Sequence, residues 1–141
     1  MKNFLRSLAA LAVISWSGLT LAEVAVIVHP SAGVDSLTAD EISRLFMGKS
    51  KSFPNGSPAT PLNQDDGSAT RDLFNQEICN KSPSQYKAYW SKLVFTGKGT
   101  PPKDSGDDAA VKALVAGNPT MIGYVDASVV DNSVKVIHKL P

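Results

Sequence analysis

The stretch ATPLNQDDGSATRDLF, residues 59–74, joins a short apolar segment to an amphipathic one through a polar turn. Residues 59–63 have the composition of a short strand. Leu73, Phe74 and Ile78 fall on one face of a helix that begins near Ser68. A strand that passes directly into a helix is the building unit of α/β domains. This stretch therefore predicts an α/β fold.

The rest of the chain repeats the same alternation of strands and helices. VAVIVH (24–29) is a β-branched apolar run typical of buried strands in parallel sheets, and MIGYV (121–125) and VKVI (134–137) are two further strands. Helices are predicted in LTADEISRLF (37–46), where Thr38 and Glu41 are spaced as a capping box, from Ser82-Pro83 onward, and over 109–116. A long flexible loop is expected over 95–108. We expect one domain with a mostly parallel sheet flanked by helices.

Two groups of side chains are predicted to lie in the core. Tyr86, Tyr89, Trp90, Leu93 and Val94 recur at helical spacing, which favours packing over a ligand site. The single cysteine, Cys79, lies beside Ile78 on a predicted helix, which indicates a buried apolar role.

Residues 1–22 have the layout of a secretory signal peptide. Lys2 and Arg6 precede an apolar run from Leu8 to Trp16, and the segment closes on small residues ending at Ala22. The apolar run is shorter than the roughly 20 residues of a membrane-spanning helix; a buried N-terminal helix is the alternative. We expect cleavage after Ala22, a periplasmic location without membrane insertion, and one mature domain over 23–141.

The charge of the mature chain argues against nucleic acid as a partner. Of 14 basic residues, 12 lie outside the leader, against 13 acidic ones, so the net charge is −1 and no basic field is present. Metal and cofactor sites are not expected, since His29 and His138 have no ligand-spaced partners. Neither a phosphate loop nor a nucleophile elbow is complete, so no enzymatic activity is predicted.

The turn at residues 66–71 admits two interpretations. A helix N-terminus exposes unpaired N–H groups and attracts anions, and Gly67, Ser68, Thr70 and Arg71 supply backbone freedom, hydroxyl donors and a guanidinium. Alternatively, Asp66 or Ser68 only caps the helix. From these six residues alone, the capped helix is the simpler interpretation.

The order of three motifs adds a family resemblance. LTADEISRLFMGK, then DDGSATRDLF, and finally GNPTMIGYVD together resemble the periplasmic phosphate-binding proteins of ABC transporters, over nearly all of residues 35–126. The resemblance implies a single lobe of a type II periplasmic-binding-protein-like fold. Phosphate or a related oxyanion is the implied ligand, and an ABC transporter permease, a second copy or a sensor protein are the candidate partners.

The resemblance also implies the site residues. The family's Gly-Ser-Gly-Thr turn falls on Gly67, Ser68, Ala69 and Thr70, with Arg71 directly after it. Two departures stand out: Gln64 occupies the position of a family arginine, and family members have two lobes in a chain more than twice as long. The expected function is therefore oxyanion binding at residues 67–71. The rival is an interaction or sensor module that derives from one lobe and binds ligand weakly or not at all.

Overall fold

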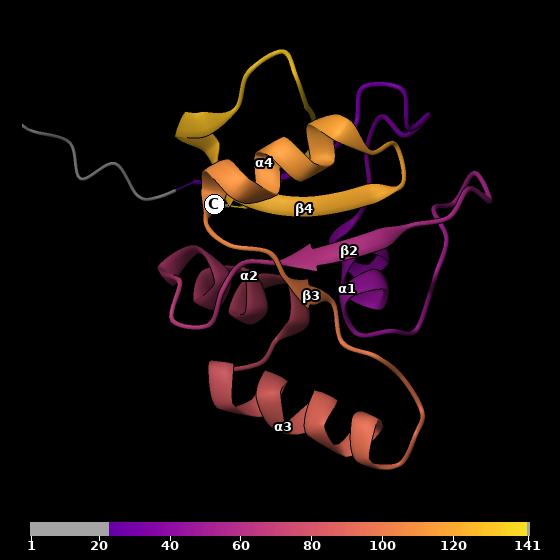
Figure 1. Ribbon diagram of the computed structural model, residues 1–141, viewed down its shortest axis with the longest axis vertical. Helices are drawn as coiled ribbons and strands as arrows, with labels where there is room; N and C mark the ends of the chain where they lie inside the picture. The colour runs from indigo at the N-terminus through magenta and orange to yellow at the C-terminus, as the bar shows by residue number, and fades with distance from the viewer. Residues whose placement is uncertain (1–22, 141) are drawn as a thin grey trace, which may run out of the picture.

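The computed structural model describes residues 23–140 (Figure 1). None of the helices within these residues has the length and apolar character needed to cross a membrane. The predicted leader, residues 1–22, lies outside the described residues. The elements follow one another as β1 (Val24–Val28), α1 (Ala39–Phe46), β2 (Thr60–Asn63), α2 (Ala69–Cys79), α3 (Pro83–Phe95), β3 (Lys103–Asp104), α4 (Asp108–Gly117), β4 (Met121–Asp126), the 3-10 turn η1 (Ala127–Val129) and β5 (Lys135–Leu140).

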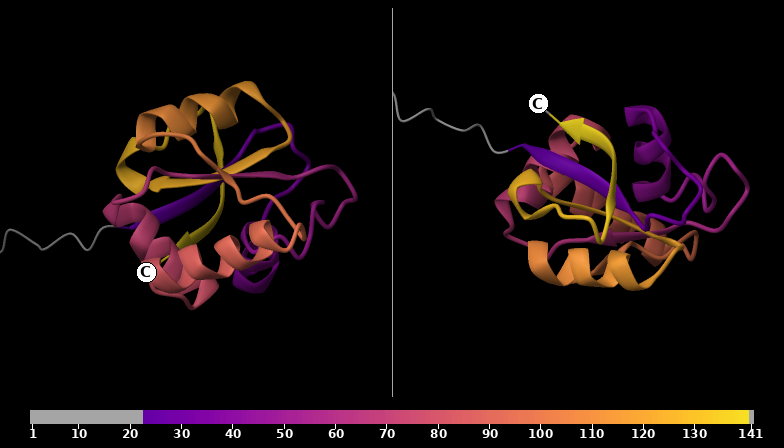
Figure 2. Two further views of the ribbon diagram at one scale, coloured as in Figure 1. Left: turned by 60° about the horizontal axis from the view of Figure 1, so that its bottom comes forward. Right: turned by 90° about the horizontal axis from the view of Figure 1, so that it is seen from above.

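The five strands form one sheet in the order β3-β2-β4-β1-β5. Strand β2 runs parallel to β3 and to β4, whereas β1 is antiparallel to both β4 and β5. Four strands therefore share one direction, as the predicted α/β fold with a mostly parallel sheet requires. The exception is β1, whose assignment to a parallel sheet was wrong: the start of β1 lies beside the end of β5, with Val24 opposite Leu140 (Figure 2).

The composition of β1 reflects its place inside the sheet. Val24, Val26 and Val28 face the core beneath α1, α2 and α3, while Ala25 and Ile27 face the core beneath α4. All five side chains are buried because helices cover both faces (Figure 1). A central strand covered on both faces has a continuous apolar run whichever direction its neighbours take.

Close contacts hold the helices against β4 and against one another. Tyr124 stacks on Phe74 of α2 with ring centroids 3.9 Å apart, and Phe46 of α1 meets Phe74 edge-on at 4.7 Å. On the other face Gly123 lets α4 approach, since a Cβ built at this position would lie 2.5 Å from Val111 Cγ1. The layers are thus fixed on both sides of β4, the neighbour of the strand β2 that leads to the candidate site.

Helix α3 is attached to the end of α1 by aromatic side chains. The Tyr86 hydroxyl and the Trp90 indole N–H both donate to the Phe46 carbonyl, at 3.0 and 3.3 Å, and the Tyr89 hydroxyl donates to the Met47 carbonyl at 2.6 Å. Carbonyls at a helix C-terminus lack partners within the helix, so these bonds satisfy them.

The predicted aromatic core of α3 is only partly confirmed. Tyr86 and Trp90 are buried, and Tyr89 and Leu93 pack against them, but Val94 is 52% exposed. The side chain of Val94 faces a groove instead of the sheet. The helical period alone could not reveal this difference, because the loop that follows α3 leaves this end of the helix uncovered.

The segment expected to be a flexible loop, residues 95–108, contains the edge strand β3, which pairs with β2 in parallel. The predicted burial of Cys79 is confirmed: it is 8% exposed, and burial raises the pKa of its thiol to about 12.

Candidate functional site

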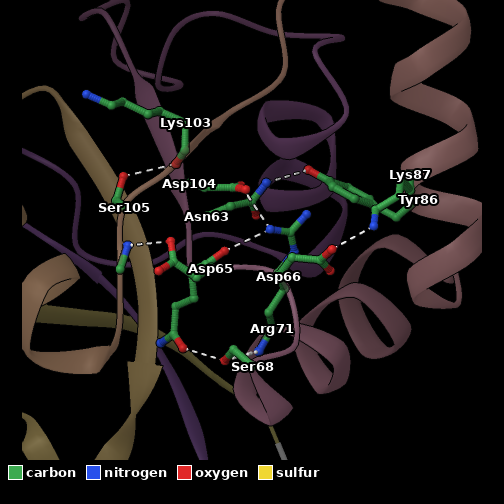
Figure 3. Close-up of polar contacts among 12 residues, drawn as sticks. Asn63, Asp65, Asp66, Ser68, Arg71, Tyr86, Lys87, Lys103, Asp104 and Ser105 are labelled. Atoms are coloured by element: carbon green, nitrogen blue, oxygen red, sulfur yellow. Dashed lines mark hydrogen bonds and ion pairs between the residues drawn. The ribbon is translucent and has the colours of Figure 1, made fainter.

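The predicted site residues, Gly67 to Arg71, follow one another where the chain leaves β2 and starts α2. Figure 3 shows two of them, Ser68 and Arg71. Gly67 has a φ of +88°, a left-handed conformation that glycine adopts without strain. Ser68 is the N-cap of α2, and its Oγ accepts a hydrogen bond from the Arg71 backbone N–H at 3.1 Å. The helix cap considered in the sequence is therefore present.

The Ser68 hydroxyl also has an internal acceptor. Its Oγ donates to Gln64 Oε1 at 2.6 Å, so one neighbouring side chain already accepts its proton. Gln64 is 2% exposed, and its Nε2 donates to the Asp108 carboxylate at 2.6 Å and to the Tyr124 carbonyl at 3.0 Å. The residue at the family's arginine position is thus a neutral amide that connects β2, α2, α4 and β4.

The Arg71 side chain reaches from the first turn of α2 back to the end of β2 and to β3. One guanidinium nitrogen, Nη1, donates to the Gln64 carbonyl at 2.8 Å and to the Asp104 carboxylate at 2.9 Å. The arginine side chain is only 10% exposed, and its guanidinium lies 5.8 Å from the centroid of the Tyr86 ring. A carboxylate of the edge strand β3 therefore occupies part of the hydrogen-bonding capacity that the prediction assigned to an oxyanion.

The other predicted residues remain open to solvent or half-buried. Gly67 and Ala69 are exposed and Thr70 is half-buried. Within residues 23–140, the Thr70 hydroxyl and the backbone N–H groups of Ala69 and Thr70 have no hydrogen-bond acceptor. These three donors are available to an incoming acceptor, and two of them belong to the first turn of a helix, where the helix dipole favours negative charge.

Carboxylates surround the turn and oppose that preference. Asp66 accepts from Lys87 at 2.6 Å, and this hydrogen bond lowers the pKa of the Asp66 carboxyl. Asp65 accepts from the Gly106 backbone N–H at 3.0 Å, and Asp104 faces Arg71. An anion entering here must therefore approach several negative charges, two of which are paired with cations.

A buried network supports the site from below. Asn63, at the end of β2, donates from Nδ2 to the Tyr86 hydroxyl at 3.1 Å and accepts from the Tyr124 hydroxyl at 3.0 Å. Burial raises the pKa of Tyr86 to about 12 and raises that of Tyr124 further. Both tyrosines therefore stay neutral hydrogen-bonding groups over the physiological pH range, and the floor of the site is pre-organised.

Sequence reasoning missed three members of this arrangement: Asp104, Asp108 and Tyr124. Asp104 and Asp108 lie 33 and 44 residues from their partners, and no motif connects them. The parallel pairing of β2 with β3 brings Asp104 beside Asn63, and only the topology could have indicated this contact.

Next to Arg71 lies a groove of about 960 Å³ between α3 and residues 100–104, which we call the α3 groove. Arg71, Asp104 and Asn63 are among its lining residues. The site therefore has two sides: the open first turn of α2, and the groove beyond the guanidinium.

Comparison with known protein families identifies the family of this chain. A family model described as a PBP superfamily domain matches residues 19–139. The chain belongs to the PBP superfamily. The match confirms the resemblance and the α/β fold predicted from the sequence. A search of curated proteins finds no match to this member of the superfamily.

Solved structures of phosphate-transport proteins have the same fold. One, described as a phosphate ABC transporter substrate-binding protein with bound phosphate from Clostridium perfringens, is 28% identical with a TM-score of 0.62, and the match covers 82% of this chain and 45% of that one. An ABC-type phosphate transport receptor from Vibrio cholerae is 18% identical with a TM-score of 0.65, over 83% and 47% of the two chains. PstS from Borrelia burgdorferi is 14% identical with a TM-score of 0.61, over 82% and 47%. This PBP superfamily chain spans about half the length of these proteins.

Proposed function

We propose that this protein is a binding protein, not an enzyme, that takes phosphate or a related oxyanion at residues 67–71. The observation that carries the proposal is the first turn of α2, where Ala69 and Thr70 offer backbone N–H groups beside the Thr70 hydroxyl. Helix N-termini of this kind bind phosphate. The 28% identity to a substrate-binding protein whose structure contains phosphate supports the same ligand class.

The expected affinity is low. The Ser68 hydroxyl and Arg71 are engaged with Gln64 and Asp104, so a ligand must compete with internal partners. A helix N-terminus contributes about 0.3–1 kcal/mol for a bound charge, and each charge-assisted hydrogen bond about 1.5–3 kcal/mol before the cost of association. One open lobe therefore supports a dissociation constant on the order of 0.1–10 mM.

A proline at residue 69 tests the site without disturbing the helix. Ala69 is the first residue of α2, where proline is well tolerated, and Ser68 already has the extended conformation that precedes proline, with φ −67° and ψ 126°. Ala69→Pro removes one N–H donor. We expect calorimetric titration to show phosphate binding in the parent protein and at least a threefold weaker affinity in Ala69→Pro and in Thr70→Ala.

Parallel titrations with sulfate and with a nucleotide show which oxyanion the protein prefers. Gln64→Arg restores the family residue next to the Asp108 carboxylate, which is available as a partner for the new cation, and should strengthen binding by up to about tenfold. If phosphate binds equally to the parent, to Ala69→Pro and to Thr70→Ala, residues 67–71 are not the site.

The internal bonds of Ser68 and Arg71 favour a second candidate, an interaction or sensor module without a tight ligand. In that case the Arg71–Asp104 pair stabilises the fold and no oxyanion binds at millimolar concentration. The titration above separates the two, because only the first candidate gives saturable phosphate binding.

Export through a cleaved leader at residues 1–22, followed by a single periplasmic domain over 23–141, completes the proposal. An ABC transporter permease, a second copy or a sensor protein would be the partner. The mass of the protein secreted by its native host checks the cleavage: we expect it to begin at Glu23, and a retained Met1 in a membrane fraction would contradict export.

A further inference from the structure

The α3 groove is larger and more apolar than an inorganic oxyanion requires. It measures about 960 Å³, and its walls are formed by Trp90, Val94 and Phe95 of α3 and by Pro101 and Pro102 of the opposite segment. Sites for organic ligands commonly measure about 300–1,000 Å³, with apolar walls and a few fixed polar groups. Phosphate alone would leave nearly all of this groove empty.

Exposed apolar side chains gather at the same groove. In the described part of the chain, the large apolar residues classed as exposed are Val94, Phe95 and Leu114, and the first two line this groove. Phe95 is 92% exposed, so its whole ring is available to a ligand. Neighbouring exposed apolar side chains beside a groove mark a binding surface more often than isolated ones do.

The charged groups of the groove favour an anion. Arg71, Lys87 and Lys103 line it together with one carboxylate, Asp104, and Asp66 pairs with Lys87 at 2.6 Å, so the positive charges exceed the negative ones by one. Arg71 is the least exposed of these groups and lies at the inner part of the groove, over the Tyr86 ring. Apolar walls with a recessed guanidinium are complementary to a molecule with an apolar body and an anionic end.

We propose that the α3 groove binds a small amphipathic oxyanion, with its anionic group at Arg71 and its apolar body along Val94 and Phe95. This inference rests on the proposed function, because it assigns the oxyanion an organic substituent. A phosphate monoester with an aromatic group represents the class, and phenyl phosphate is the probe.

The experiment is a titration of the full chain, labelled with ¹⁵N, followed by amide chemical shifts. Phenyl phosphate, inorganic phosphate and benzyl alcohol are compared. We expect phenyl phosphate to bind at least about tenfold more tightly than inorganic phosphate, as burial of an aromatic ring provides. The largest shifts should lie in residues 90–95 and 100–104.

One double-serine variant and one single-serine control locate the apolar contact. Val94→Ser with Phe95→Ser should remove the tenfold preference for phenyl phosphate and leave inorganic phosphate binding intact. Leu114→Ser, an exposed apolar position on α4 across the sheet, is the matched control and should retain the preference.

Each contrary result has a separate meaning. If phenyl phosphate and inorganic phosphate bind with equal affinity and the shifts are confined to residues 67–71, the α3 groove does not bind the ligand, and the proposed function still stands. Binding of neither overturns both. If benzyl alcohol binds as tightly as phenyl phosphate, the groove does not recognise the anionic group, and the assignment of that group to Arg71 is wrong. If the protein dimerises with rising concentration and Phe95→Ser does not, the groove binds a second copy of the chain, and the proposal of a small-molecule ligand is wrong.

Discussion

Asp104 is the residue whose removal should most increase phosphate affinity. Its carboxylate accepts a hydrogen bond from Arg71 Nη1 at 2.9 Å and so competes with any oxyanion for the same guanidinium. Asp104→Asn keeps the side chain's size and its carbonyl acceptor but removes the charge. Arg71 stays in place because its bond to the Gln64 carbonyl is unaffected.

The magnitude follows from exposure and distance. The Asp104 side chain is 53% exposed, so its pair with Arg71 is worth about 0–1 kcal/mol, as for other solvated ion pairs. A carboxylate about 4 Å from a bound anion repels it by about 1 kcal/mol per charge in water. Loss of both effects should improve binding by about 1–2 kcal/mol, which is roughly a 5- to 30-fold lower dissociation constant.

The assay is calorimetric titration with phosphate at constant pH and ionic strength. Asp131→Asn is the matched control: Asp131 also pairs with a cation, Lys112, and its side chain is 54% exposed, but it lies beside α4. The control should leave phosphate affinity unchanged. An Asp104→Asn affinity within twofold of the parent, or weaker, would refute the idea that this carboxylate competes with the ligand.

Three predictions concern the fold. Burial raises the pKa values of Cys79 and Tyr86 to about 12, so the folded state holds protons that the unfolded state releases. The free energy of unfolding should therefore fall as pH rises from about 9 to 12. Urea titrations at several pH values measure this slope, and Tyr86→Phe should reduce it. Cys79 should react with a thiol reagent only after unfolding, and rapid labelling of the native protein would place it at the surface. Gly123→Ala should destabilise the protein by about 1–3 kcal/mol in thermal melts because its Cβ meets Val111, whereas Gly117→Ala, which meets nothing within 4 Å, should cost less than 1 kcal/mol.

Local patterns in the sequence were sufficient to predict most elements of the fold. The capping box of Thr38 and Glu41, the Ser68 N-cap and the Ser82-Pro83 helix start are all present, because each depends on residues no more than three positions apart. The direction of β1 was not predictable, since burial on both faces gives the same apolar run in either direction. The two residues of β3 are too short for any period to reveal.

The candidate site likewise has features that local sequence predicts and features that only the fold determines. Its position at residues 67–71 follows from a contiguous motif, and whether an oxyanion binds there stays a prediction. The internal partners of Ser68 and Arg71 depend on strand pairing across tens of residues. Asp104 reaches Arg71 only because β3 aligns beside β2 in parallel. Contacts of this kind are properties of topology and cannot be read from spacing along the chain.

The shortness of β3 couples local unfolding of the sheet edge to the chemistry of Arg71. Two residues pair with β2, and the Ser105 backbone N–H adds a bond to the Asn63 carbonyl at 2.8 Å. Short edge segments open at low free-energy cost compared with the whole domain. Each opening that withdraws Asp104 removes the carboxylate from the guanidinium and leaves its bond to the Gln64 carbonyl, so hydrogen exchange at Ser105 reports how often the arginine is without its internal anion.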